Sequence, residues 1–256
     1  MSPGSRDRDG YKRQAAEAAL AYVRPGMVLG LGHGSTAIHA LRGLAAQLRA
    51  GLLWDVAGVP CSEAVAREAR ELGLPLTTLE AHPTVDLTID GADEIDPDLN
   101  LIKGAGGALL REKIVARASR QLVIVADESK LSPALGTARA VPVEVVPFGW
   151  RRHAAYLELQ GARSELRRDR QGRPFVTDHG HWLLDCHFAS LEDPVTLAAR
   201  LKERTGVVEH GLFLGLATEV IVAGPTGVRR LSRPRDTAHA SSGQGTPRCT
   251  ALGQEA

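Results

Sequence analysis

Apolar runs and helix-like segments alternate along the first half of the chain. Over residues 12–23 the alanines and Leu20 recur at helical spacing, and a Pro-Gly pair ends that helix before the apolar run 27–31. The same pattern predicts helices after residue 35 and over 62–72 and 107–119, and strands near 55–59, 75–78, 85–89 and 122–126. Because the run 122–126 is apolar throughout, it suits a strand buried on both faces. The alternation predicts an α/β fold with a Rossmann-like parallel sheet flanked by helices.

The rhythm changes between residues 133 and 147, where prolines accumulate. A helix opening at Trp150, short alternating segments and a helix over 194–202 then predict a smaller inserted α+β domain. An edge extension of the main sheet is the alternative for this unit. We therefore expect an α/β catalytic domain of residues 1–132 plus 204–230, a small α+β domain of 133–203, and a disordered tail of 231–256, which lacks aromatic residues.

Charge and cysteine usage narrow the class of protein. Lys and Arg total 31 against 30 Asp and Glu, a formal net charge of +1, so an anionic ligand must be bound by local groups. Cys61, Cys186 and Cys249 are odd in number and lack metal-ligand spacing, which argues against zinc and disulfides. We find neither the apolar core of a signal peptide nor a run long enough for a membrane helix, and we expect a cytoplasmic protein.

A glycine-rich loop, GLGHGST, follows the first predicted strand at residues 30–36. Glycines let the backbone approach an anion, and amides at a helix start can hold a phosphate together with the hydroxyls of Ser35 and Thr36. A tight turn capped by Ser35 is the alternative interpretation of this segment. The loop has neither G-x-G-x-x-G nor G-x-x-x-x-G-K spacing, which argues against NAD and ATP.

Carboxylates follow the strand 85–89 in the segment DGADE, which places Asp90 and Asp93 three residues apart. A solvated acidic loop or a helix cap is the plain alternative, and a magnesium site is a weaker one. No histidine lies within the segment and Lys103 is near in sequence, so we favour acid–base chemistry without a metal.

Two further motifs, KGAGG and DESK, each contain a lysine that we expect at the same edge of the sheet. In KGAGG the Lys103 ammonium and the loop amides could converge on an oxyanion. Glu112, one turn into the next helix, would face that pocket as a general base with a raised pKa, although an ordinary surface position is the alternative. In DESK, Lys130 could reach a phosphate or hydroxyl. Because the carboxyl ends of parallel strands meet at one edge, we expect one crevice.

Taken in order, GLGHGST, DGADE, KGAGGALLREK and DESK resemble the motifs of the type A ribose-5-phosphate isomerase family at similar spacing. The similarity spans nearly everything from residue 12 to residue 228. It implies interconversion of D-ribose 5-phosphate and D-ribulose 5-phosphate through an enediolate, in the non-oxidative pentose phosphate pathway, without cofactor or metal. It also implies a homodimer or homotetramer, with no nucleic-acid or membrane partner.

The resemblance also assigns roles to individual residues. Glu112 would move a proton between C2 and C1, Asp90 would assist ring opening, and Lys103, oriented by Asp93, would stabilise the enediolate oxygen. The residues implied to bind substrate are His33, Gly34, Ser35, Thr36, Asp90, Gly91, Ala92, Asp93, Lys103, Gly104, Ala105, Gly106 and Lys130.

The chain departs from the family pattern at two positions. His33 stands where the family usually has threonine, which predicts a changed substrate affinity or pH profile. Ala105 replaces a glycine and would be strained at a positive φ. A non-catalytic sugar-phosphate sensor, and an isomerase of another sugar phosphate, are the alternative functions.

Overall fold

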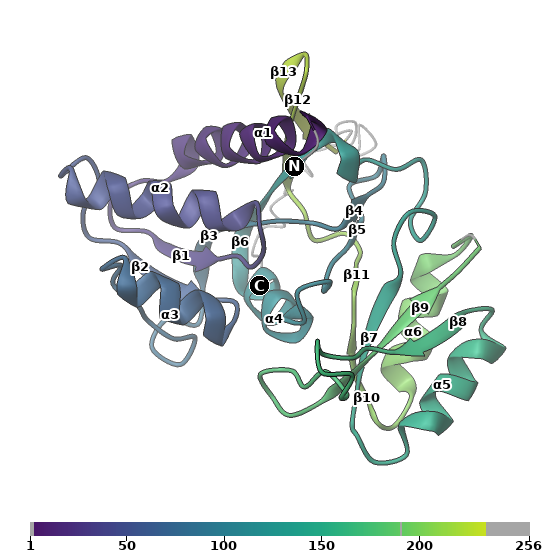
Figure 1. The fold of residues 1–256 in the computed structure, drawn as a ribbon. Helices are drawn as coiled ribbons and strands as arrows, with labels where there is room; N and C mark the ends of the chain where they lie inside the picture. Colours follow the sequence, from purple (N-terminus) through teal and green to yellow (C-terminus); the bar gives the residue numbers. More distant parts are fainter. Residues whose placement is uncertain (1–2, 190, 234–256) are drawn as a thin grey trace, which may run out of the picture.

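A six-stranded sheet forms the centre of the larger part of the fold in the computed structural model, which describes residues 3–189 and 191–233 (Figure 1). Its strands, in spatial order, are β13 (Gly227–Ser232), β12 (Glu219–Gly224), β6 (Ser119–Asp127), β3 (Val85–Asp90), β1 (Val28–Leu31) and β2 (Ala57–Pro60). All neighbours pair in parallel except β12 and β13, which pair antiparallel. The predicted α/β fold with a mostly parallel sheet is confirmed.

Helices cover both faces of this sheet. They are α1 (Pro3–Ala19), α2 (Ala37–Arg49), α3 (Glu63–Glu71) and α4 (Leu109–Ala118), with short 3-10 turns η1 (Leu20–Tyr22) and η2 (Glu128–Lys130). Val123 and Val125 of β6 pack in one core cluster with α1 and α2, whereas Leu122 and Ile124 pack with Ala116 of α4. Burying each such side chain stabilises the fold by about 1.5–3 kcal/mol. The apolar run therefore reflects a strand buried on both faces.

A three-stranded antiparallel sheet lies between the large sheet and the small domain. Its order is β11 (Leu212–Phe213), β5 (Leu101–Ile102) and β4 (Glu94–Ile95). Strands β4 and β5 connect the end of β3 to Lys103, and β11 comes from a segment more than a hundred residues later. Residues distant in sequence are thus brought beside the glycine-rich segment that begins at Lys103.

The small inserted domain has a sheet of its own rather than an extension of the main one (Figure 1). Its antiparallel strands are β10 (Val207–His210), β7 (Val141–Val145), β9 (Trp182–His187) and β8 (Arg163–Leu166), accompanied by α5 (Trp150–Leu159) and α6 (Pro194–Glu203). Leu157, Leu184 and Leu201 belong to a core cluster of this domain. Because β10 pairs with β7, residues 207–210 join the small sheet although we placed them with the larger domain. The domain division itself stays a prediction.

Further segments differ from the sequence-based expectation. The strand expected near residues 75–78 is a single bridge between Leu76 and Gly58, next to Pro75, which has no N–H to continue a ladder. Of the expected tail, Leu231 and Ser232 end β13, and residues 234–256 lie outside the described residues. No helix among the described residues is both long and apolar enough to span a membrane.

Candidate active site

Three charged side chains meet in a buried cluster at the carboxyl edge of the large sheet. The Lys103 Nζ lies 3.0 Å from Asp90 Oδ2 and 2.9 Å from Glu112 Oε1, and it also donates to the Gly91 carbonyl. All three side chains are almost inaccessible, with exposed fractions of 3% for Lys103, 1% for Asp90 and 4% for Glu112. The structure therefore brings together three residues that the sequence analysis selected from separate motifs.

Asp90 is held by the loop that follows β1. Its Oδ1 accepts the His33 N–H at 3.0 Å and the Gly91 N–H at 2.7 Å. A Cβ on Gly32 would lie only 2.5 Å from the Asp90 Cα, so a glycine is needed where the two backbones meet. Gly32 thus allows the loop to pack closely against Asp90.

Lys103 and Glu112 are placed by β5 and by the first turn of α4. The Lys103 N–H donates to the Gly211 carbonyl at 2.9 Å, which extends the pairing of β5 with β11. Glu112 lies in the first helical turn of α4, where its N–H donates to the Ala108 carbonyl at 3.0 Å. The carboxylate therefore faces Lys103 from the start of a helix, where negative charge is favoured.

The electrostatics of this cluster suit acid–base chemistry. Burial raises the pKa of Glu112 to about 7, with the Lys103 charge opposing this shift and Asp90 adding to it. Burial alone would lower the pKa of Lys103, but the charges of Asp90 and Glu112 outweigh it and raise that pKa. At neutral pH the cluster thus holds a fixed ammonium beside a carboxyl group that can exchange a proton.

A small pocket, about 60 Å³ in volume, opens beside the cluster. It is lined by His33, Gly34, Ser35, Thr36, Gly91, Ala92, Asp93, Lys103, Gly104, Gly106, Glu112 and Lys130. The lining thus unites nearly all the residues that we expected to bind substrate. Asp90 lies buried behind Lys103, and Ala105 is exposed beside the pocket rather than part of its lining.

Asp93 makes a different contact from the one expected. Its Oδ2 accepts the Ala105 N–H at 2.9 Å, whereas the carboxylates within ion-pair distance of the Lys103 ammonium are Asp90 and Glu112. Asp93 therefore holds the glycine-rich loop, and no direct contact supports our expectation that it orients Lys103. The sequence motif placed Asp93 in the pocket correctly but could not say which donor it would bind.

Both departures from the family pattern are accommodated. His33 Nδ1 lies 2.8 Å from the Ser62 Oγ, and its ring packs so closely on Gly106 that a Cβ there would fall 2.4 Å from Nε2. Burial lowers the pKa of His33, which favours the neutral ring. Among the described residues positive φ angles outside glycine occur at Asp55 and Leu99, so Ala105 carries no such strain.

The sequence analysis missed a cation at the mouth of the pocket. Lys12 of α1 donates from Nζ to the Ser35 Oγ at 3.0 Å. Burial, Arg139 and Lys12 all lower the pKa of Lys130, although Asp93 and Asp127 oppose them. Lys12 lies in no glycine-rich or acidic motif. Its position in the first predicted helix was the one feature of the sequence that could have pointed to it.

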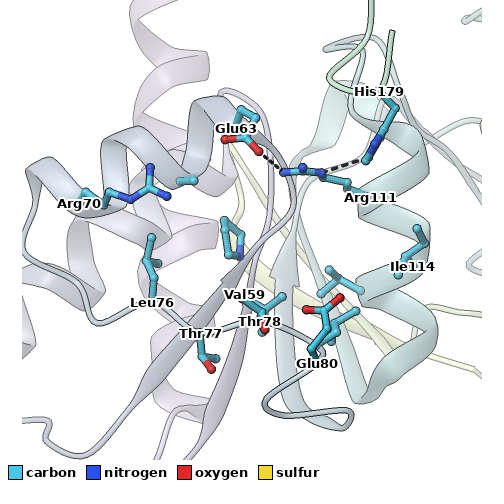
Figure 2. A pocket seen from close by; sticks show the side chains of 14 residues that line it. Val59, Glu63, Arg70, Leu76, Thr77, Thr78, Glu80, Arg111, Ile114 and His179 are labelled. Carbon is cyan, nitrogen blue, oxygen red and sulfur yellow. Dashed lines mark hydrogen bonds and ion pairs between the residues drawn. The ribbon is translucent and has the colours of Figure 1, made fainter. Parts of the chain in front are cut away.

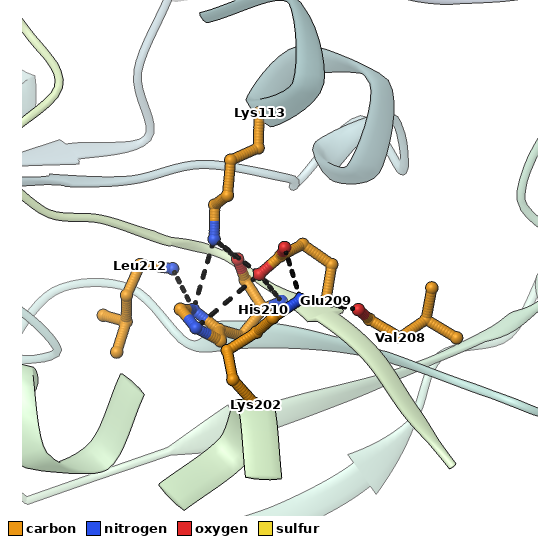
Figure 3. Close-up of polar contacts among 6 residues, drawn as sticks. All are labelled: Lys113, Lys202, Val208, Glu209, His210 and Leu212. Carbon is orange, nitrogen blue, oxygen red and sulfur yellow. Dashed lines mark hydrogen bonds and ion pairs between the residues drawn. The ribbon is translucent and has the colours of Figure 1, made fainter. Parts of the chain in front are cut away.

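A second buried ion-pair network begins at Lys113, the residue after Glu112 (Figure 3). The Lys113 Nζ lies 2.8 Å from Glu209 Oε1 and 2.5 Å from the His210 carbonyl oxygen, while Lys202 Nζ reaches Glu209 Oε2 at 2.9 Å. The network ties α4 to β10 and α6 of the small domain. None of these residues faces the pocket, and sequence reasoning identified none of them as part of such a network.

The pocket drawn in Figure 2 is larger, at about 450 Å³, but has different chemistry. It lies beside α3 and α4, with an apolar wall that includes Val59, Leu76 and Ile114. Arg111 spans it, 2.8 Å from Glu63 Oε1 and donating from Nε to His179 Nε2 at 3.1 Å. Because the buried Lys103–Glu112 pair, with the raised pKa of Glu112, lies at the smaller pocket, that pocket is the candidate active site.

Comparisons with known proteins agree with this choice. The family model described as ribose 5-phosphate isomerase A (phosphoriboisomerase A) matches residues 57–227. A ribose-5-phosphate isomerase A of Chloroflexus aurantiacus is 60% identical over 221 residues, which cover 86% of this chain and 92% of the relative. One of Roseiflexus castenholzii is 54% identical over 224 residues, which cover 88% and 96% of the two chains.

Solved structures give the same result. Ribose 5-phosphate isomerase from Plasmodium falciparum superimposes with a TM-score of 0.85 at 41% identity, over 88% of this chain and 99% of that one. A D-ribose-5-phosphate isomerase in complex with phospho-erythronic acid gives a TM-score of 0.87 at 36% identity, with the same coverage of both chains. With a catalytic-type cluster in place and these similarities along most of its length, the chain belongs to the ribose 5-phosphate isomerase A family.

Proposed function

We propose that the pocket beside Lys103 interconverts D-ribose 5-phosphate and D-ribulose 5-phosphate, with Glu112 as the base. Membership of the family makes the chain an aldose–ketose isomerase of the pentose phosphate pathway. The observation that carries the assignment of residues is the Lys103 ammonium held within 3.0 Å of both Asp90 and Glu112 in a buried site. A carboxylate beside a positive charge supports the proposed roles of base and oxyanion stabiliser.

In the proposed reaction Glu112 removes the proton from C2 of the open-chain aldose. The electrons of the broken C–H bond form the C1–C2 double bond, and the negative charge passes to the carbonyl oxygen on C1. Lys103, protonated throughout because its pKa is raised, stabilises that oxygen. A proton passes from the C2 hydroxyl to the C1 oxygen, and Glu112 returns its proton to C1 to give the ketose.

Asp90 is suited to handle the hydroxyl protons and to assist ring opening. Its carboxylate touches the Lys103 ammonium on one oxygen and the loop amides of His33 and Gly91 on the other. These contacts keep the carboxylate in one orientation, as a group that relays protons requires.

The phosphate group is proposed to lie at the mouth of the pocket. Ser35 and Thr36 offer hydroxyls at the start of α2, and the ammonium groups of Lys12 and Lys130 flank them. A helix start with lysines beside it binds phosphate through amides and through charge. The related structure in complex with phospho-erythronic acid, a phosphorylated sugar acid, supports a ligand of this class.

The test is turnover of ribose 5-phosphate by purified wild type and by Glu112→Gln, each with EDTA present. Wild type should turn over rapidly, and loss of a general base should lower the kcat of the variant by about 10²–10⁴-fold while substrate still binds. Glu71→Gln, on the exposed end of α3, is the matched control and should behave as wild type. Binding of ribose 5-phosphate without turnover by wild type would instead favour the sensor function.

We further infer a cytoplasmic protein that associates as a homodimer or homotetramer. The widely separated cysteines and the family resemblance support this. Light scattering coupled to size-exclusion chromatography measures the mass directly. A mass equal to one chain at micromolar concentration would contradict the proposed assembly, and cell fractionation tests the location.

A further inference from the structure

An arginine of the small domain donates hydrogen bonds to the active-site loop. Arg167, the residue after β8, donates from Nη1 to the Gly104 carbonyl at 2.8 Å and to the Ala105 carbonyl at 3.1 Å. Its Nε donates to Asp185 Oδ2 at 2.9 Å, and its Nη2 binds the other oxygen of that carboxylate. The planar guanidinium is thereby fixed on β9 and directed at two consecutive carbonyl groups of the loop.

This contact determines which way the loop amides point. In a planar trans peptide the C=O and the following N–H point in opposite directions. Holding the Gly104 and Ala105 carbonyls toward the small domain therefore turns the Ala105 and Gly106 N–H groups away from it. The Ala105 N–H donates to the Asp93 carboxylate at 2.9 Å, and Asp93 lines both the candidate active-site pocket and the cavity beside Arg167.

The Gly106 N–H is the amide left for a ligand. Gly106 lines the pocket, and within residues 3–189 and 191–233 no protein acceptor takes its N–H. An N–H that enters the pocket near Lys103 can donate to an oxygen that becomes negative during the reaction. Whether this N–H can reach such an oxygen depends on the orientation of the 105–106 peptide, whose carbonyl accepts a hydrogen bond from Arg167.

The loop needs such a restraint because glycine dominates it. Gly104 and Gly107 have φ angles of +109° and +85°, and glycine loses more conformational freedom on ordering than any other residue. The small domain also packs Phe175 against Gly107, where a Cβ would lie 2.5 Å from the ring, and the Arg167 guanidinium lies 5.8 Å from the ring centre. Two side chains of the small domain thus border the loop.

We propose that Arg167 is a positioning residue of the isomerase, which orients the Gly106 amide toward the reacting oxygen by holding the carbonyls of Gly104 and Ala105. The proposal rests on the proposed function of the pocket. It gives the inserted domain a specific part in the reaction, exerted through hydrogen bonds to the loop backbone.

Steady-state kinetics of Arg167→Ala with and without N-ethylguanidinium test the proposal. We expect kcat to fall by about 10- to 100-fold and KM to change by no more than about threefold. The loss in kcat should not exceed that caused by removing an oxyanion-hole donor itself. Added N-ethylguanidinium should restore much of the lost kcat, because the cavity beside Arg167, about 460 Å³ in volume, admits it. Ethylammonium, which lacks the planar fork, should restore none.

Arg168→Ala is the matched control, since Arg168 is the exposed neighbour that donates to Gly172 instead of to the loop. It should leave kcat unchanged. Wild-type kcat in Arg167→Ala, or a loss that N-ethylguanidinium leaves unaltered, would overturn the proposal.

If Arg167→Ala does not fold, Asp185→Asn decides instead. It keeps the guanidinium but weakens its anchor, and should lower kcat severalfold at nearly constant KM, whereas an unchanged kcat would overturn the proposal. Turnover by wild type tests the proposed function separately, because only the ratio of variant to wild type bears on Arg167.

Discussion

Two buried lysines, Lys103 just after β5 and Lys113 in α4, differ in what surrounds them. Lys103 touches two carboxylates and opens onto the pocket, and its pKa is raised. Lys113 touches one carboxylate, Glu209, lies outside the pocket lining, and burial lowers its pKa to about 8. Their ammonium groups lie 5.6 Å and 4.8 Å from the centre of the same ring, Phe213.

The difference shows that burial alone does not make a lysine catalytic. Glu209 is shared by Lys113 and Lys202, and although burial opposes it, these charges bring the pKa of Glu209 down to about 2. Burial also lowers the pKa of His210 to about 3, so this neighbour of Lys113 is neutral. In this network one carboxylate is shared by two ammonium groups, whereas in the Lys103 cluster one ammonium is shared by two carboxylates, one of which can take up a proton.

Replacing Lys103 with methionine should have the largest effect. Without the ammonium, kcat should fall by at least about 10²–10³-fold because the enediolate oxygen loses its positive partner. Asp90 and Glu112 would face each other without a cation, which raises the pKa of Glu112 further. Kinetics of purified Lys103→Met, with circular dichroism to verify folding, test this, and a kcat within tenfold of wild type would contradict it.

Replacing Lys113 with methionine should damage stability instead of chemistry. Glu209 loses a close partner but keeps Lys202, so the variant should lose about 0.5–3 kcal/mol of stability, while its kcat should stay within about threefold of wild type. Urea denaturation measures the loss. The double variant Lys113→Met/Glu209→Gln should be less destabilised than the sum of the single changes. A kcat as low as that of Lys103→Met would erase the distinction between the two lysines.

The pH dependence of kcat/KM should separate the two lysines further. Glu112 acts as a base only when deprotonated, and its pKa of about 7 means that kcat/KM falls about tenfold per pH unit well below that value. Lys113→Met should leave this acid limb in place, whereas Lys103→Met should move it to higher pH. A profile of wild type that stays flat from pH 8 to pH 5 would rule out a raised pKa for the base.

His33→Thr should have the smallest effect. His33 lines the same pocket as Lys103 but belongs to the loop after β1. The variant loses the contact with Ser62, and we expect KM to change by about fivefold, the equivalent of one hydrogen bond of about 1 kcal/mol. Because the pKa of His33 is already lowered, the profile above pH 7 should keep its shape. Parallel kinetics from pH 6 to pH 8 test this, and a new ionisation above pH 7 would be inconsistent with a neutral ring.

Local patterns were sufficient to predict the parallel sheet and most of the pocket. Strands such as β6 are recognisable because burial on both faces demands an unbroken apolar run, and the motifs around Asp90 and Lys103 follow strands whose carboxyl ends share one edge. The roles of the individual site residues remain predictions, because position in the pocket does not by itself establish what a side chain does.

Partner choice was beyond the reach of the sequence. Lys113 and Glu209 are 96 residues apart, and no local period indicates that one faces the other. Asp93 binds the Ala105 amide because the loop backbone turns toward it, and Arg167 reaches the same loop from the small domain, 63 residues after Gly104. Such contacts depend on how two sheets are set against each other, which spacing along the chain does not encode.

The crossing of residues 209–213 beside α4 has a consequence for how the protein is made. This segment supplies Glu209 to Lys113, the Gly211 carbonyl to Lys103 and the Phe213 ring to both lysines. During synthesis the Lys103 cluster therefore lacks its contacts with Gly211 and Phe213 until these residues have left the ribosome. The motifs that contain Asp90, Lys103 and Glu112 emerge about a hundred residues earlier. A nascent chain that ends before Phe213 contains Asp90, Lys103 and Glu112 but not the segment that packs against Lys103. Activity should therefore appear late in translation.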